Sequence, residues 1–251
     1  MTGAHMTPYR TALVTGASRG IGAAIARRLR GLGLAVHAVG RDAAKLQALC
    51  AETGCVALIA DVTDIDAVLR GLRDVDIDVL VNNAGAVPAV APLHLQSAAD
   101  IDAALDVNLR APLHLMRALL PGMVARGRGH VINVGSTAGA AVFAGTGPYA
   151  AAKAGLSMAG RVARYDLAGS GVRLTEIVPG RVQTDVYLGT YGGDAERLHE
   201  TMYAHHRAVQ PEDVAEAVAA ALSLPERATI SVLEVVPTDQ AVGGHVYPKR
   251  G

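Results

Sequence analysis

Short apolar runs alternate along the chain with longer segments in which apolar residues recur at intervals of three and four positions. The apolar runs predict about seven strands, at 11–15, 34–40, 55–60, 76–82, 129–135, 172–178 and 230–236. The segments between them predict helices near 20–31, 42–52, 63–73, 98–125, 148–168 and 211–223. Because the strands are almost continuously apolar and helices connect them, we expect an α/β fold with a doubly wound parallel sheet covered on both faces.

Two segments fall outside this alternation. Residues 1–6 read either as a cloning scar before a second start at Met6 or as a short frayed terminus, and in both cases they carry no fold. Residues 183–208 are polar and lack a clear period, which is typical of a substrate lid beside the strand ends of such a sheet. Since no linker or repeat divides the rest, we expect residues 7–251 to form a single domain.

Composition narrows the function classes. The chain has 23 Lys and Arg against 23 Asp and Glu, so it lacks the net positive charge of a nucleic-acid or membrane-surface binder. Aromatic residues are only 3% of the chain, which disfavours a stacking platform for single strands. No apolar run is long enough for a membrane span and no signal peptide opens the chain, so we expect a soluble, cytoplasmic protein.

Cysteine and histidine usage argues against metal chemistry. Cys50 and Cys55 are too few for a disulfide scaffold or a four-thiolate zinc site, and we expect a small core pair in a reducing compartment. His199, His205 and His206 have no cysteine or suitably spaced carboxylate beside them. No metal is therefore expected.

A glycine-rich loop, Gly16-Ala-Ser-Arg-Gly20-Ile-Gly22, follows the first predicted strand and opens the first helix. Backbone amides at a helix start, with no side chains in the way, form a seat for a pyrophosphate. The glycines alone could also be an ordinary tight turn. Their place between strand and helix favours the dinucleotide site of a Rossmann-type fold.

Further motifs follow in a characteristic order. They are Asn82-Asn83-Ala84-Gly85 after the fourth strand, Asn108, Ser136 at a strand end, Tyr149-Ala-Ala-Ala-Lys153, Pro179-Gly180 and Thr184. In this order and spacing, from residue 11 to about 240, the chain resembles the compact, single-domain short-chain dehydrogenase/reductase family. The stretches 119–123, 135–139 and 233–240 resemble a bacterial subgroup that includes 3-hydroxy acid dehydrogenases and clavulanic-aldehyde-reducing enzymes.

The resemblance implies four catalytic residues. Tyr149 would be the general acid that protonates the substrate oxygen, and Ser136 would orient the carbonyl. Lys153 would hold the nicotinamide ribose, and Asn108 would anchor a proton-relaying water. Tyr149 and Lys153 share a helix face, so the ammonium and the positive nicotinamide would lower the tyrosine pKa from about 10 toward about 7. Taken singly, these residues could equally be a solvated helix face, a turn hydroxyl and a backbone-bonding amide.

The resemblance also implies a set of cofactor contacts. They are Gly16, Ser18, Arg19, Gly20, Ile21 and Gly22 in the loop, Arg41, Asp61, Val62, Asn82, Ala84 and Gly85 near the adenosine, and Tyr149, Lys153, Pro179, Gly180, Val182 and Thr184 toward the nicotinamide. Arg41 would accept a 2′-phosphate, with Arg19 as a second cation, so NADP(H) is favoured over NAD(H). Asp42 would reverse this choice after a shift of one residue, unless it caps the next helix.

The predicted function is an NADP(H)-dependent ketone or aldehyde reductase, acting on a small-molecule carbonyl or alcohol and assembling as a homotetramer or dimer. One alternative is a non-catalytic NADP-binding regulator or scaffold. Another is a sugar-nucleotide epimerase or dehydratase, but only about 70 residues follow Pro179, too few for its usual second domain. Arg181, Arg197 or Arg207 could hold a substrate carboxylate or simply be solvated surface, and Phe143 could line the pocket or pack.

Overall fold

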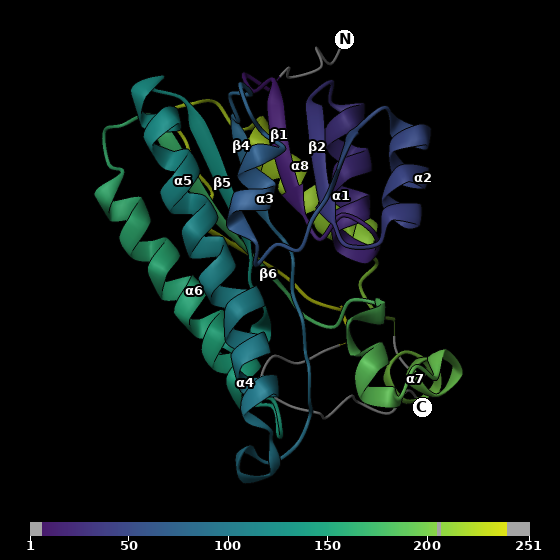
Figure 1. Cartoon of the computed structure of the whole chain (residues 1–251). Coiled ribbons are helices and arrows are strands. Elements are labelled where there is room, and N and C mark those ends of the chain that lie inside the picture. The colour runs from purple at the N-terminus through teal and green to yellow at the C-terminus, as the bar shows by residue number, and fades with distance from the viewer. Residues whose placement is uncertain (1–6, 205–206, 240–251) are drawn as a thin grey trace.

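All the strands of the computed structural model, which describes residues 7–204 and 207–239, lie in one parallel sheet (Figure 1). The sheet has the order β3-β2-β1-β4-β5-β6-β7. Its strands are β1 (Thr11–Thr15), β2 (Ala35–Gly40), β3 (Val56–Ile59), β4 (Val79–Asn82), β5 (Gly129–Val134), β6 (Val172–Pro179) and β7 (Val232–Val235). The predicted doubly wound, Rossmann-type fold is thus confirmed. Residues 1–6 lie outside the described residues, and the single domain stays a prediction.

Helices cover both faces of the sheet and bury a separate apolar core on each (Figure 1). One face carries α1 (Gly20–Gly31), α2 (Ala43–Thr53) and α8 (Pro211–Ser223), and the other carries α3 (Ile65–Arg70), α5 (Ala111–Ala125) and α6 (Gly147–Asp166). Residues such as Leu29 and Val218 fill the first core, and Leu115 and Leu156 fill the second. Strands buried on both sides explain why their sequences are apolar without alternation.

The long helix predicted at 98–125 is divided into three parts. α4 (Ala98–Leu105) leads into a π-helical segment, Asp106–Arg110, and then into α5. The π-helical segment contains Asn108. Single π turns of this kind occur mostly at functional sites, because the wider turn redirects one side chain.

The sequence order of the strands reverses between β1 and β4, which creates a crevice at their carboxyl ends. The aperiodic segment predicted as a lid lies beyond these ends (Figure 1). It forms a 3₁₀-helix, Asp185–Tyr191, and α7 (Ala195–Met202), although its sequence shows no clear helical period. Asp194 caps α7 by accepting a hydrogen bond from the Arg197 amide at 2.9 Å. His205 and His206 lie outside the described residues.

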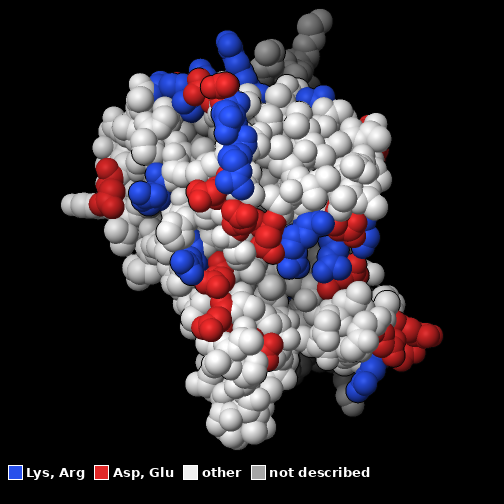
Figure 2. Space-filling model, viewed as in Figure 1, with Lys and Arg blue, Asp and Glu red and all other residues white. Residues whose placement is uncertain are grey.

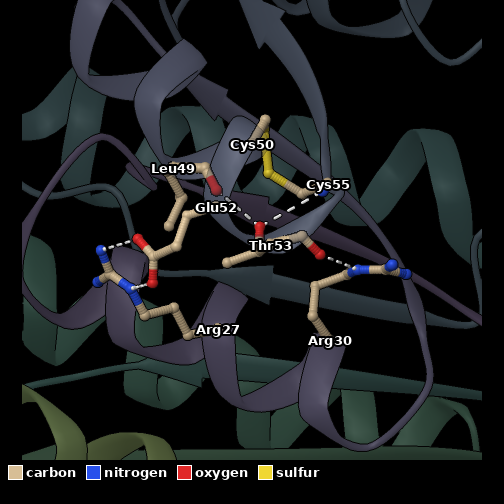
Figure 3. The surroundings of a disulfide bond; sticks show 7 residues. All are labelled: Arg27, Arg30, Leu49, Cys50, Glu52, Thr53 and Cys55. Atoms are coloured by element: carbon tan, nitrogen blue, oxygen red, sulfur yellow. Dashed lines mark hydrogen bonds and ion pairs between the residues drawn. A yellow bond between two sulfur atoms is a disulfide. The ribbon is translucent and has the colours of Figure 1, made fainter.

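Cys50 and Cys55 form a disulfide, so the expectation of a reduced core pair is wrong (Figure 3). Gly54 ends α2 in the left-handed region, at φ 72°, and turns the chain back until the two Cα atoms are 4.5 Å apart. The bond therefore joins the end of α2 to the start of β3. The same corner is held by a bidentate pair between Arg27 and Glu52, with nitrogen–oxygen distances of 2.8 and 2.9 Å.

Charge on the surface is mixed. On the face shown in Figure 2, basic and acidic side chains lie interleaved, in keeping with their equal numbers. Within 7–204 and 207–239 no helix is long and apolar enough to cross a membrane. The same residues hold no group of three or more His, Cys, Asp or Glu side chains that could bind a metal ion.

Candidate active site

A cavity of about 960 Å³ opens at the carboxyl ends of the strands and is bounded by the lid. Its walls come from the glycine loop, the end of β2, the segment after β4, the start of α6 and the turn after β6. Nearly all of the predicted site residues line it: Gly16, Ser18, Arg19, Gly20, Ile21, Gly22, Arg41, Asp61, Val62, Ala84, Gly85, Ser136, Tyr149, Lys153, Pro179, Gly180, Val182 and Thr184. Asn82 and Asn108 do not line it.

The glycine loop leaves room and hydrogen-bonding groups for a pyrophosphate. A Cβ atom on Gly22 would lie 2.3 Å from the Gly16 carbonyl oxygen, so only glycine allows this close turn. No side chain caps the start of α1, whose amides open toward the cavity. The Ser18 hydroxyl is buried without a protein partner. These features fit a phosphate-bearing cofactor, which would accept hydrogen bonds from the amides and from Ser18.

At the end of β2, Arg41 and Asp42 both line the cavity but have different surroundings. Asp42 is the N-cap of α2 and accepts a hydrogen bond from the Lys45 amide at 3.1 Å. Arg41 follows the strand directly, and its Nη1 lies 3.4 Å from Asp61 Oδ2. Partial burial raises the pKa of Asp61, but hydrogen bonds from Thr63 and the charge of Arg41 outweigh it and lower the pKa. Arg41 and Lys45 thus both line the cavity at the end of β2.

Asn83, and not the predicted Asn82, lies on the cavity wall. The Asn82 side chain is buried under the strand ends and donates to Asn133 Oδ1 at 2.9 Å. Asn83 Nδ2 donates to the Thr15 carbonyl at 2.8 Å and packs against the glycine loop. Adjacent strand residues point to opposite sides, so a motif alone does not say which of two asparagines faces the cavity.

Ser136, Tyr149 and Lys153 converge at the other end of the cavity. Ser136 lies two residues after β5, and its hydroxyl is near enough to Tyr149 to lower the pKa of that phenol. Lys153, one turn along α6, places Nζ 5.8 Å from the centre of the Tyr149 ring. Lys153 Nζ also donates to the Val134 carbonyl at 2.8 Å, which anchors the ammonium at the end of β5.

Burial dominates the protonation of this pair. It raises the pKa of Tyr149, against a lowering by the hydrogen bond from Ser136. It lowers the pKa of Lys153 to about 8, against a raising by the negative charge of Glu176. The sequence analysis expected a lowered pKa for Tyr149. In the protein without its cofactor, the pKa of Tyr149 is raised instead.

Asn108 lies directly behind the cavity wall. Its Nδ2 donates to the carbonyl oxygens of Ala86 at 2.7 Å and Ala104 at 2.8 Å, and its Oδ1 accepts from the Ala86 amide at 3.3 Å. A Cβ atom on Gly85 would lie 3.1 Å from Asn108 Oδ1 and 3.9 Å from Lys153 Nζ. Asn108 is thus close to the lysine, with only glycine between them.

Residues of the lid and of the segments next to it line the end of the cavity that holds Tyr149. Phe143, Arg181, Tyr187, Thr190, Tyr191 and Met202 line this end. Burial raises the pKa of Tyr187, and the neighbouring Tyr149 raises it further. Tyr203 connects the lid to the segment after β6. Its hydroxyl donates to the Thr184 carbonyl at 3.0 Å and accepts from the Thr184 amide at 3.4 Å.

Among the three arginines considered for a substrate carboxylate, only Arg181 lines the cavity. Arg207 instead pairs with Asp239 at 2.9 Å. The sequence analysis did not single out Asn83, which lines the cavity, or Glu176, a buried carboxylate behind Lys153. The second had a visible signal, since Glu176 is the one acidic residue in the apolar run 172–178.

Comparisons with known proteins agree with this geometry. A family model described as short chain dehydrogenase matches residues 10–189. The NADP-dependent 3-hydroxy acid dehydrogenase YdfG of Escherichia coli is 40% identical over 240 residues, covering 92% of this chain and 96% of that protein. An uncharacterized short-chain type dehydrogenase/reductase, y4eK of Sinorhizobium fredii, is 42% identical over 239 residues, covering 95% of this chain and 96% of that protein.

Solved structures show the same relationship. The closed form of serine dehydrogenase complexed with NADP+ is 38% identical, with a TM-score of 0.89 and coverage of 96% of this chain and 100% of that chain. A metagenomic short-chain oxidoreductase in complex with NADP is 35% identical, with a TM-score of 0.78 and coverage of 94% and 100%. The resemblance drawn from the motifs is confirmed: the chain belongs to the short-chain dehydrogenase/reductase family of oxidoreductases.

Proposed function

We propose that the protein is an NADP(H)-dependent alcohol dehydrogenase or carbonyl reductase that uses Tyr149 as its general acid and base. The observation that carries the proposal is the convergence of Ser136, Tyr149 and Lys153 at one end of a cavity whose other end is a glycine loop. A scaffold without catalysis would have no need to keep these three side chains together.

Each side chain has a distinct task in this proposal. When bound, the nicotinamide exchanges a hydride with the substrate carbon. The Tyr149 hydroxyl donates a proton to the substrate oxygen during reduction and recovers it during oxidation. Ser136 donates a hydrogen bond to the same oxygen and fixes its position. Acid–base help of this kind contributes about 10²–10⁴-fold to the rate.

Lys153 and Asn108 support the tyrosine. The Lys153 ammonium would hold the nicotinamide ribose and favour the phenolate form of Tyr149 through its charge. Asn108 would anchor the water that carries protons to solvent, since it lies on the far side of Gly85 from the cavity and close to Lys153.

The proposed cofactor is NADP(H). Arg41 and Lys45 lie at the adenosine end of the cavity, while Asp42 is occupied as the N-cap of α2. A guanidinium and an ammonium there favour a 2′-phosphate. The names of YdfG and the serine dehydrogenase complex both include NADP, which supports the same choice.

The proposed substrate is a small hydroxy acid or the corresponding oxo acid. The names of the two relatives specify a 3-hydroxy acid and serine, which is itself a 3-hydroxy acid. Arg181 would bind the carboxylate, because it lines the cavity beside Tyr187. Replacing Arg181 by Met should raise KM for hydroxy acids more than for uncharged alcohols of the same size, and an equal change for both would remove Arg181 from this role.

We also propose a homo-oligomer that acts in the cytoplasm, where its nucleotide cofactor is found. Leu113 and Val124 on α5, and Met158, Val162 and Tyr165 on α6, expose apolar side chains along neighbouring helices. An apolar stripe of this kind is typical of a subunit interface.

The first experiment titrates NADPH and NADH separately and follows cofactor fluorescence. Hydroxy acids are then added with NADP+, and absorbance at the reduced-nicotinamide band is recorded. Tyr149→Phe should bind NADPH like the wild type and lose about 10²–10⁴-fold of turnover. The matched control is Tyr165→Phe on the same helix, which removes a hydroxyl but keeps the apolar ring of the proposed interface, and it should keep full turnover.

The outcomes separate the candidate functions. Tight NADPH binding with no turnover on any carbonyl or hydroxy acid would favour the regulator or scaffold. Full turnover in Tyr149→Phe would exclude this tyrosine as the proton donor. Binding of neither nucleotide would remove the whole proposal.

A further inference from the structure

Glu176 is a buried carboxylate that the proposed mechanism does not use. It lies on β6 with 7% of its surface exposed. Its Oε2 accepts a hydrogen bond from Ser157 on α6 at 2.8 Å. Its Oε1 lies 2.6 Å from the place where a Cβ atom on Gly135 would stand. The carboxylate therefore occupies the space between the end of β5 and the face of α6.

Lys153 approaches the same place from the other side. It precedes Ser157 by four residues on α6, so both side chains lie on one face of the helix. Its Nζ donates to the carbonyl of Val134, the residue before Gly135. Lys153 is also buried, with 3% of its surface exposed. Val134 is the last residue of β5 and Gly135 follows it, so the two charged groups lie on either side of the end of this strand without a hydrogen bond between them.

A buried ammonium is unfavourable unless an opposite charge or good hydrogen bonds compensate it. The Val134 carbonyl supplies one hydrogen bond, and the Glu176 carboxylate supplies the negative charge. The lost contact with water lowers the pKa of Lys153 to about 8, although Glu176 acts against it. Without the Glu176 carboxylate, the pKa of Lys153 would be lower still, so Lys153 would lose its charge at a lower pH.

Other groups near Lys153 do not replace this charge. Tyr149, on the same helix, has a raised pKa and is neutral through the physiological range. Tyr187, which faces Tyr149 from the lid, also has a raised pKa. Asn108, from the π-helical segment behind Gly85, is a neutral amide.

We propose that Glu176 is a positioning residue for the reaction: it is the buried counter-charge, held by Ser157, that keeps Lys153 in its ammonium form beneath Tyr149. It touches neither substrate nor cofactor and acts only through the lysine. Its catalytic consequence rests on the function proposed above, but its effect on Lys153 can be measured without any turnover.

The scarcity of lysine makes that measurement direct, because the chain has only Lys45, Lys153 and Lys249. Protein labelled with ¹³C at the lysine Cε should give three signals, which Lys45→Arg and Lys249→Arg assign. The Lys153 signal is followed against pH in wild type and in Glu176→Gln. The glutamine has the same shape and can keep the bond to Ser157, while it removes the charge.

The expected result is a midpoint for Lys153 near pH 8 in the wild type. In Glu176→Gln the midpoint should fall by about one pH unit or more, and in Glu176→Asp by less. Glu234→Gln removes an exposed carboxylate from the neighbouring β7 and should leave the midpoint unchanged. If the enzyme turns over, the high-pH limb of its kcat/KM profile should move in the same direction.

Two outcomes would overturn the proposal. The first is an unchanged Lys153 midpoint in a folded Glu176→Gln protein. Glu176 would then have only a structural role, even if the variant melted at a lower temperature. Should Glu176→Gln not fold, Ser157→Ala keeps the charge but frees the carboxylate, and an unchanged midpoint there would count equally against it. A shifted midpoint in a protein that turns over no substrate would leave this inference standing and remove the proposed function.

Discussion

Arg41 and Asp42 are adjacent in the sequence, yet they have opposite tasks in the folded chain. The Asp42 carboxylate is occupied by the amide of Lys45 and by Lys45 Nζ at 3.6 Å, so it caps a helix. The Arg41 side chain is 77% exposed and lines the cavity beside Asp61, where the proposed adenosine would bind. We therefore expect Arg41 to contribute most of the proposed preference for NADP(H) over NAD(H).

Arg41→Ala should weaken NADPH binding and leave NADH binding nearly unchanged. A charge-assisted hydrogen bond contributes about 1.5–3 kcal/mol, which corresponds to a loss of about 10- to 150-fold in affinity for NADPH. Titration of both nucleotides by fluorescence measures the effect, with Arg70→Ala, an exposed arginine of α3, as the control. An equal loss for both nucleotides would show that Arg41 does not read the phosphate.

His130 illustrates a buried group that has no part in the proposed chemistry. It lies on β5, and its Nε2 is 2.8 Å from the hydroxyl of Thr175 on the neighbouring β6, where both side chains are fully buried. Burial, reinforced by the nearby charge of Arg173, lowers its pKa to about 3. The folded protein therefore keeps this ring neutral where an unfolded chain would protonate it, between about pH 6.5 and the folded value.

In that window the unfolded state binds more protons, so the free energy of unfolding should fall as pH falls, by about 1.4 kcal/mol per unit from this group. Above about pH 6.5 the contribution is complete. Urea unfolding at several pH values tests this, and His130→Gln should flatten the slope. His94→Gln, at an exposed position, should keep it. Equal slopes in all three proteins would contradict the lowered pKa.

At the scale of elements, the corner between α2 and β3 is held in several ways. The Thr53 hydroxyl donates to the Leu49 carbonyl at 2.8 Å, and Arg30 Nε donates to the Thr53 carbonyl at 2.9 Å (Figure 3). The disulfide closes only a short loop between these elements. It adds a covalent connection to an end of α2 that other contacts already hold.

Reduction of the Cys50–Cys55 bond should therefore lower the free energy of unfolding by about 2 kcal/mol, the chain-entropy value for so short a loop. Unfolding with and without reductant measures it, and the double variant Cys50→Ser/Cys55→Ser should not respond to reductant. Two free thiols in unreduced protein would mean that the bond does not form.

At the scale of the whole molecule, the apolar stripe on α5 and α6 lies on the outer side of the helices that carry the catalytic residues. Tyr149 and Lys153 are at the start of α6, and Met158 and Val162 expose their side chains further along the same helix. An interface here would stiffen the helix that positions the tyrosine.

Val162→Glu should thus shift the protein toward smaller assemblies and reduce turnover at low protein concentration. Light scattering coupled to size exclusion measures the assembly. The control is Val142→Glu, which places the same charge at a fully exposed site outside α5 and α6. A monomeric wild type, or equal behaviour of both variants, would remove this face as the interface.

The order of strands and helices follows from the residue pattern alone, because buried strands and amphipathic helices need apolar residues at fixed intervals. The pattern also placed Tyr149 and Lys153 on one helix face, since four residues make about one turn. It did not show the helices of the lid, because helices of only 7 and 8 residues repeat the helical period too few times to stand out in a polar segment.

Contacts between residues far apart in the chain depend on the tertiary fold and could not be predicted from the sequence pattern. The fold turned Asn83 toward the cavity in place of Asn82, put Asn108 behind Gly85, and brought Cys50 against Cys55. It also placed Glu176 beside Lys153, although 23 positions separate them. Period and spacing describe one element at a time, whereas a shared cavity or a buried counter-charge depends on how the elements pack against each other.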